Sequence, residues 1–298
     1  MKAHSPLGVG GAASNAADNA ITPTLLQAFE VPWSGTGSSA IAEIYAAPSS
    51  VSRGWNGAAL FSVNGEVLDP LGATGPKRCV TGHALSALPP AQAHVMDRIS
   101  TLDVKLDSED FILSTIGAEQ LSKGDNRALI GTEIVQFAEA LSLGNAAWRL
   151  KGLLRGRGGT EDSAMSGQAS GAQFALLDNA LTRIDPAALG NSKSIAAIGL
   201  ADQDAVVCEI AGRGRSLRPL VPVHGRASLL PDGTLSLVWT RRARGAWTWD
   251  DEVDVPLVEE SERYIVGVGP VAGPYRRWVV TEPHLNLDPQ TLDRKSVV

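Results

Sequence analysis

Aromatic, basic and acidic residues crowd the stretch from 239 to 262, where their spacing could serve binding or catalysis. Interleaved basic and aromatic residues can bind single-stranded nucleic acids or glycans. Two carboxylates can cleave a glycosidic bond when a rigid cleft holds them about 5 or 9 Å apart. The residues concerned are Trp239, Trp247, Trp249, Arg241, Arg242, Arg244, Asp250, Asp251, Glu252, Asp254, Glu259, Glu260 and Glu262.

The acids of this stretch weaken both possibilities. They follow the arginines on one proline-bearing loop, so they would repel phosphates and neutralise the guanidinium groups, and nothing indicates a rigid cleft. We interpret the stretch as a hairpin whose arginines stack on tryptophans and pair with its own acids. The alternative is a carbohydrate-binding or glycoside-cleaving module that uses Trp247, Trp249 and the acids of residues 250–262.

A second basic stretch, RLKGLLRGRGGTE at residues 149–161, holds four glycines, three arginines and a lysine. Glycine permits positive φ and close backbone approach, and arginine makes planar, bidentate contacts to carboxylates. The stretch lacks the Lys-Ser/Thr ending of a P-loop, although a backbone anion nest is conceivable. We predict a structural junction in which Arg155 and Arg157 pair with carboxylates beside glycines of special conformation.

The remaining chemistry-bearing residues form no recognisable constellation. GVGGAA at residues 8–13, with Glu30 further on, fits a dinucleotide fingerprint, but the preceding KAHSPL contains proline and is no buried strand. The five histidines are scattered, and neither HExxH nor G-x-S-x-G occurs. Cys79 and Cys208 lie far apart and are predicted to be reduced, buried thiols. The sequence thus predicts no catalytic residue, cofactor or metal site.

Composition sets further limits on the function. The 298 residues are enough for two domains. A formal net charge of −6 argues against nucleic-acid binding by the whole chain. No apolar stretch approaches the ~20 residues of a membrane span, and the N-terminus lacks the apolar core of a secretory signal.

Short apolar runs separated by turn residues predict the elements that must position these groups. LDVKL at residues 102–106 alternates apolar and polar residues with a period of two, and Asn64-Gly65 and Asp232-Gly233 are hairpin signals. EIVQFAEAL at 133–141 is predicted as a strand, with a helix as the alternative, and residues between 161 and 173 are predicted as a loop. We expect a mainly β chain, with an antiparallel β domain and then a fibronectin type III-like sandwich.

The predicted domain boundaries follow composition. Residues 1–22, rich in Ala, Gly, Ser and Asn, are expected to be a flexible arm. The antiparallel β domain spans 23–212, and the sandwich, with Leu235, Leu237 and Trp239 in its core, spans 213–298. An Arg/Gly/Pro-rich segment near residues 213–222 separates them.

Long motifs in this sequence resemble the C-terminal region of the host-specificity or baseplate proteins of tailed phages and gene transfer agents. The central one is GDNRALIGTEIVQFAEALSLGNAAWRLKGLLRGRGGTE at residues 124–161. AEIYAAPSSVSRGWNGAALF and ISTLDVKL lie upstream of it, and RPLVPVHGRASLLPDGTLSLVWTRRARG lies downstream. Together the similar motifs cover roughly residues 40–285.

This resemblance implies a non-enzymatic tail-tip or baseplate protein that assembles with other tail proteins, usually as a homotrimer. It implies a location in the bacterial cytoplasm during assembly and then in the virion or gene-transfer-agent tail, where a cell-surface glycan is a candidate partner. Full-length family members carry hub domains and often a glycoside-hydrolase-like barrel ahead of this region, and this sequence is expected to lack that part. It ends at LDRKSVV, where further strands are expected. The chain is therefore expected to be a fragment of a larger protein, with an incomplete last sandwich.

Overall fold

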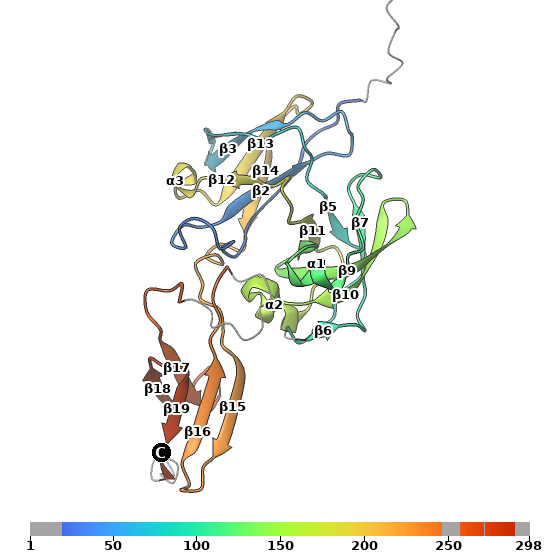
Figure 1. Cartoon of the computed structure of the whole chain (residues 1–298). Helices are drawn as coiled ribbons and strands as arrows, with labels where there is room; N and C mark the ends of the chain where they lie inside the picture. Colours follow the sequence, from blue (N-terminus) through green and yellow to red (C-terminus); the bar gives the residue numbers. More distant parts are fainter. Residues whose placement is uncertain (1–19, 94, 246–256, 271, 290–298) are drawn as a thin grey trace, which may run out of the picture.

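The computed structural model describes residues 20–93, 95–245, 257–270 and 272–289 (Figure 1). Of these residues, 42% lie in strands and 7% in helices, and helix is thus well below the usual third. The prediction of a mainly β chain with antiparallel sheets is confirmed. Most of the predicted arm, including the GVGGAA motif, lies outside the described residues.

The first sheet has seven strands, which come from both sides of residues 74–181. They are β1 (Leu25–Glu30), β2 (Ile44–Ser49), β3 (Ala58–Asn64), β4 (Val67–Ala73), β12 (Thr182–Ile184), β13 (Ser194–Gly199) and β14 (Val206–Ala211). Their order is β12-β2-β1-β14-β13-β3-β4. β1 and β14 run parallel, and the other neighbours are antiparallel. The predicted Asn64-Gly65 hairpin is present, shifted by one residue, because Asn64 still pairs with Val67.

The second sheet closes on itself. Its strands are β5 (Thr81–Ala84), β6 (Met96–Asp97), β7 (Leu102–Leu106), β8 (Arg127–Ile130), β9 (Glu133–Gly144), β10 (Ala147–Leu154) and β11 (Gln173–Leu176). The order β10-β7-β5-β11-β8-β9 is completed by pairing of β9 with β10, while β6 adds to the end of β10. Such closure leaves these six strands without a free edge.

The interior of the closed sheet is apolar. Val104, Phe137, Leu150 and Phe174 are all buried and belong to one contiguous core. The predicted alternation of β7 is confirmed, because Leu102, Val104 and Leu106 are buried and the residues between them are half-buried. The strand assignment of residues 133–141 is confirmed over the helical alternative.

The second sheet is inserted between two halves of the first. The chain leaves the first sheet after β4, builds the closed sheet, and returns after β11 to form β12 to β14 (Figure 1). A separate apolar cluster joins the two sheets, in which Phe29 and Ala47 of the first meet Leu129, Ile134 and Ala175 of the second. The two sheets are thus packed together through side chains from both.

In the described ranges, four short helical segments connect the strands: α1 (Ala118–Ser122), η1 (Arg157–Gly159), α2 (Glu161–Ser166) and α3 (Pro186–Leu189). The prediction of a loop between 161 and 173 is wrong at its start, where α2 forms. Acidic residues in the first turn of α2 favour a helix there, and Ala164 packs in the interior.

The strands that the structure describes after residue 222 form two small sheets. β15 (Val223–Leu229), β16 (Leu235–Thr240) and β19 (His284–Leu287) make one, and β17 (Tyr264–Val268) and β18 (Arg276–Val280) make the other. Asp232 and Gly233 occupy the β15–β16 turn as predicted. The fibronectin type III-like assignment and the domain boundaries stay predictions.

Candidate functional site

Three segments meet where the sheets converge, and we call residues 155–163, 212–221 and 241–245 the three-way junction. The first segment follows β10, the second follows β14 and the third follows β16. Hydrogen bonds and ion pairs join them to one another and to the sheets. The three-way junction contains both Arg155 and Arg157, to which sequence reasoning had assigned a structural role.

Arg155 forms a buried ion pair with Glu133 at the start of β9. Its Nε lies 2.7 Å from Glu133 Oε1 and its Nη2 lies 2.9 Å from Glu133 Oε2, and both side chains are fully buried. Nη1 and Nη2 also donate to the Pro89 carbonyl, each at 3.0 Å. Glu133 Oε1 accepts the Gly156 backbone N–H at 3.0 Å. The predicted pairing of Arg155 is confirmed, and it fixes the end of β10 against β9.

The glycines after Arg155 are required by geometry. Gly156, Gly158 and Gly159 have φ of 60°, 64° and 89°, which L-residues with side chains rarely adopt. A Cβ on Gly156 would lie 2.7 Å from the Ala93 Cβ, and one on Gly159 would lie 2.6 Å from Leu220 Cδ2. The loop therefore admits its neighbours only because these positions carry no side chain.

Arg157 is held differently from Arg155. Its Nε donates to Gln136 Oε1 at 2.7 Å, and the Gln136 amide nitrogen donates to the carbonyls of Leu121 and Asp125. Burial, followed by the positive charge of Arg242, lowers the pKa of Arg157 to about 10. The guanidinium stays protonated at neutral pH. Sequence reasoning did not identify Gln136, which is buried on β9 between Val135 and Phe137.

Glu30, the acid that could have served a dinucleotide site, has a structural partner instead. It is buried, its Oε2 accepts the Gly214 N–H at 2.6 Å, and its Oε1 accepts the Ser216 N–H at 2.8 Å. The carboxylate at the end of β1 thereby shapes the turn that follows β14.

The arginines after β16 carry ion pairs within the described residues. Arg241 Nη1 lies 2.9 Å from Glu262, and Arg244 Nε lies 2.7 Å from Glu259. These two pairs confirm the predicted pairing with acids of the same stretch, but β16 and β17 belong to different sheets and do not form a hairpin. The interpretation is wrong for Arg242, which pairs with Glu161 at the start of α2. Trp247, Trp249 and the acids of residues 250–254 lie outside the described residues.

Arg244 ties the third segment to the rest of the chain. Its side chain is buried, and Nη1 donates to the carbonyls of Ser39 at 2.9 Å and Ser216 at 2.6 Å. A Cβ on Gly245 would lie 2.6 Å from the Cα of Gly35, so the two backbones are in direct contact. The arginines of this stretch thus dock the small sheets on the larger ones.

Trp239 is half-buried rather than deep in a core. Its ring meets the ring of Tyr264 edge-on at 5.2 Å between centroids, which joins the two small sheets. Beside this pair lies a groove of about 840 Å³, lined by Leu237, Val266 and residues of the 219–227 segment. No sequence motif signals this groove, because its walls come from strands far apart in the chain.

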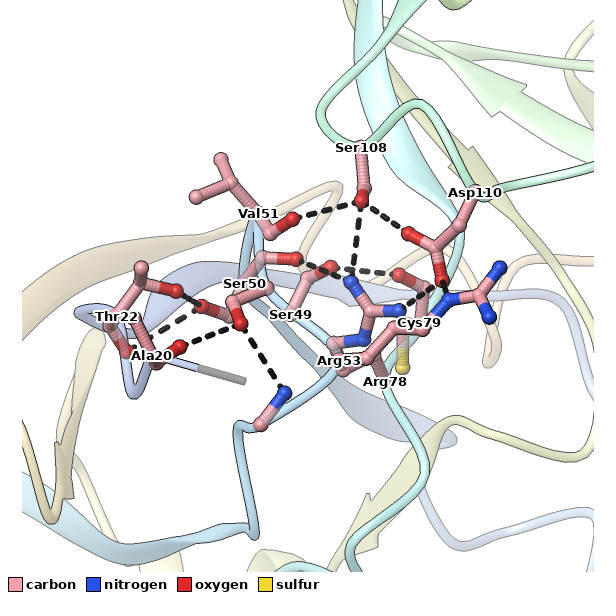
Figure 2. Close-up of polar contacts among 12 residues, drawn as sticks. Ala20, Thr22, Ser49, Ser50, Val51, Arg53, Arg78, Cys79, Ser108 and Asp110 are labelled. Atoms are coloured by element: carbon pink, nitrogen blue, oxygen red, sulfur yellow. Dashed lines mark hydrogen bonds and ion pairs between the residues drawn. The ribbon is translucent and has the colours of Figure 1, made fainter. Parts of the chain in front are cut away.

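A second polar cluster, which sequence reasoning missed, lies where the chain passes between the two large sheets (Figure 2). Arg78 Nη1 donates to the Ser50 carbonyl at 2.9 Å and to Ser108 Oγ at 3.2 Å, and Nη2 pairs with Asp110. Arg53 Nε also pairs with Asp110, at 2.7 Å. Burial raises the pKa of Asp110, but hydrogen bonds from Ser108, Arg78 and Arg53 outweigh it and lower the pKa to about 2.

The described residues show no arrangement suited to a reactive thiolate or to a metal ion. Burial raises the pKa of both Cys79 and Cys208 to about 12, which disfavours the reactive thiolate. Cys79 is fully buried as predicted, whereas Cys208 is half-buried. In the described part of the chain, no group of three or more His, Cys, Asp or Glu side chains could hold a metal ion. No helix there is long and apolar enough to span a membrane.

The structure is that of a β-rich protein in which several charged side chains join separate segments of the chain. Residues 79–175, about a third of the chain, match the model of the family described as Rcc01698-like, C-terminal, which is associated with gene transfer agent-like proteins. The matched residues cover the closed second sheet from just before β5 to within one residue of the end of β11. A search of the curated proteins found no match.

Proposed function

We propose that this chain is a non-enzymatic structural component of the tail tip or baseplate of a phage or gene transfer agent. The observation that carries the proposal is the family match over the closed sheet, since that family is associated with gene transfer agent-like proteins. The motifs outside residues 79–175 that resemble baseplate proteins extend the same argument to the first sheet and the small sheets.

The charge distribution at the three-way junction supports a structural role. Arg155, Arg241, Arg242 and Arg244 each pair with a carboxylate of the same chain. Groups engaged in this way hold segments together and are not presented to a substrate. The partners we propose are other tail proteins and further copies of this chain, arranged as a trimer around the tail axis.

The surface of the small sheets supports such partners. Leu229, Ile265 and Tyr275 are about 70% exposed or more, and a partner protein could cover such apolar side chains. The outer strands of these sheets also have edges that are unpaired among the described residues, and such edges invite pairing with another chain. The proposed location is the bacterial cytoplasm during assembly and then the particle tail.

Antibody labelling of particles from a producing host tests the proposal. We expect the chain to sediment with purified particles and the label to lie at one end of the tail. Absence of the chain from purified particles would overturn the proposal. Light scattering of the isolated chain should show oligomers or aggregates at micromolar concentration, and a sharp monomer near 31.2 kDa would contradict the expected self-association.

A glycan array and a reducing-sugar assay distinguish the proposed structural role from the carbohydrate-binding or glycoside-cleaving alternative. Saturable glycan binding that Trp249→Ala abolishes, while Trp33→Ala leaves it intact, would favour that alternative. A glycan-cleaving activity would contradict the non-enzymatic assignment directly.

A further inference from the structure

A small polar pocket lies inside the three-way junction, apart from the apolar groove of the small sheets. It has a volume of about 180 Å³ and is enclosed by residues 158–163 on one side and 212–221 on the other. For comparison, a cavity of about 150 Å³ accommodates benzene. The pocket can therefore take a ligand of a few heavy atoms, and its walls determine which kind.

Arg215 is one of the residues that line this pocket. Its side chain is half-buried, and its guanidinium makes no hydrogen bond to any of the residues that the structure describes. The guanidinium lies over Gly212, where an added Cβ would be 3.4 Å from Nη1. A guanidinium carries five N–H donors, and no Arg215 nitrogen is among the fully buried atoms without a partner, so these donors are open to solvent and to a ligand. Arg215 can therefore donate hydrogen bonds to an acceptor that enters the pocket.

The charge of the lining selects the kind of acceptor. Arg213, Arg215 and Arg218 contribute three positive charges and Asp162 one negative charge, so the pocket has an excess of two positive charges in a chain of net charge −6. Arg213 Nη1 donates to the Ser192 carbonyl at 2.5 Å, and Arg218 Nη1 to Asp162 at 3.1 Å. Each of these arginines keeps further N–H donors, because one bond uses only one of five.

The pocket is also preorganised. Glu30 fixes the turn through the backbone N–H groups of Gly214 and Ser216, and the Leu220 side chain packs against Gly159. Burial lowers the pKa of Arg215, and the carboxylates of Asp162 and Glu30 oppose that shift. A bound anion would raise the pKa of Arg215 in the same way as these carboxylates and would offset the desolvation of the guanidinium.

We propose that this pocket binds a small oxyanion, a phosphate or carboxylate group, with the Arg215 guanidinium as its direct ligand. Arginine pairs with both groups through two parallel N–H···O bonds, and Arg213 and Arg218 add to the attraction. The anion would link the loop after β10 to the turn after β14, and it would stabilise the joint between the two large sheets and the small ones.

Calorimetric titration of the full chain with inorganic phosphate, and separately with acetate, tests the proposal. Ionic strength is held constant, because screening alone alters charge interactions. We expect saturable binding of at least one anion and a rise in the melting temperature with its concentration. Binding of phosphate alone indicates a phosphoryl ligand, and binding of acetate indicates a carboxylate, such as an acidic side chain of a partner.

Arg215→Gln removes the direct ligand and should weaken binding at least tenfold. Arg277→Gln, on an exposed position of β18, makes the same chemical change elsewhere and should bind like the parent. Because Arg215 has no protein acceptor, Arg215→Gln should melt no lower than the parent in chloride alone, and only the anion-dependent rise should be lost. No saturable binding of either anion, or equal binding by Arg215→Gln, would overturn the proposal.

Discussion

The closed second sheet and the two small C-terminal sheets solve the problem of burying apolar surface in different ways. In the closed sheet, residues such as Phe137, Leu150 and Phe174 form one core, and the six strands leave no edge. Among the described residues of β15 to β19, Leu287 alone is buried. One region is complete in itself, whereas the other depends on its docking to the three-way junction and on surfaces that a partner could cover.

Breaking the buried ion pair of the closed sheet should have the largest effect. Arg155→Met leaves the Glu133 carboxylate buried without its partner and should lower the free energy of unfolding by about 3–5 kcal/mol. The double variant with Glu133→Gln should recover part of the loss. Urea unfolding followed by circular dichroism measures both. Lys123→Met, which breaks an exposed pair with Glu119, should cost about 0.5 kcal/mol or less, and an equally small loss for Arg155→Met would contradict the comparison.

The glycine after Arg155 gives the next effect. Gly156→Val forces a side chain into a backbone of φ 60° and against Ala93, so we expect a loss of about 1–3 kcal/mol. Gly65→Val is the matched control, since Gly65 has φ 65° but open space around it. Thermal melts should place the control between the parent and Gly156→Val. If Gly156→Val melts like the parent, the loop is not a constrained junction.

Trp239→Ala sharpens the comparison from the C-terminal side. A fully buried tryptophan costs about 3–5 kcal/mol when truncated, but Trp239 is half-buried, so we expect about 1–2 kcal/mol. Leu150→Ala in the closed sheet should cost about 2–5 kcal/mol. Chemical denaturation of the two variants decides the order, and a larger loss for Trp239→Ala would show a packed core in the small sheets.

The smallest effect concerns pH and the cluster around Asp110. Its pKa is about 2 in the folded chain and 3.8 as the ordinary value, so its carboxylate stabilises the fold above about pH 4 and loses this contribution as pH falls toward 2. The contribution is on the order of 1 kcal/mol, because Asp110 is partly exposed and screened. The stability difference between the parent and Asp110→Asn should shrink over that range. A difference that stays constant from pH 5 to pH 2 would show that Asp110 does not act through its charge.

Local sequence patterns predicted the strands better than the contacts between segments that are distant in the chain. The alternation of residues 102–106 and the turn residues at 64–65 and 232–233 depend on neighbours in sequence, and each element forms there. Residues 133–137 are all buried, so their sequence has no period of two, and only β-branched residues and length favoured a strand. The position of α2 was missed, because small polar residues suit a loop equally well.

The partners of the charged residues could not be predicted, for a physical reason. The sequence shows that Arg155 requires a carboxylate, but it does not specify Glu133, which lies across a hairpin. Arg78 and Asp110, or Arg242 and Glu161, meet only after strands distant in the chain have paired. Each partner is therefore set by tertiary packing, and the groove beside Trp239 and the pocket at Arg215 arise in the same way.

The insertion of the closed sheet has a consequence for synthesis on the ribosome. β14 lies between β1 and β13 in the first sheet, so the early hairpins β1–β2 and β3–β4 have nothing to join them when they emerge. The closed sheet contains only consecutive strands and can complete itself first. At ~5–20 residues per second, the early hairpins wait on the order of ten seconds with apolar faces uncovered. The two hairpins stay apart until β13 and β14 arrive, and termination between residues 176 and 194 would release a complete closed sheet with the two early hairpins not joined to each other.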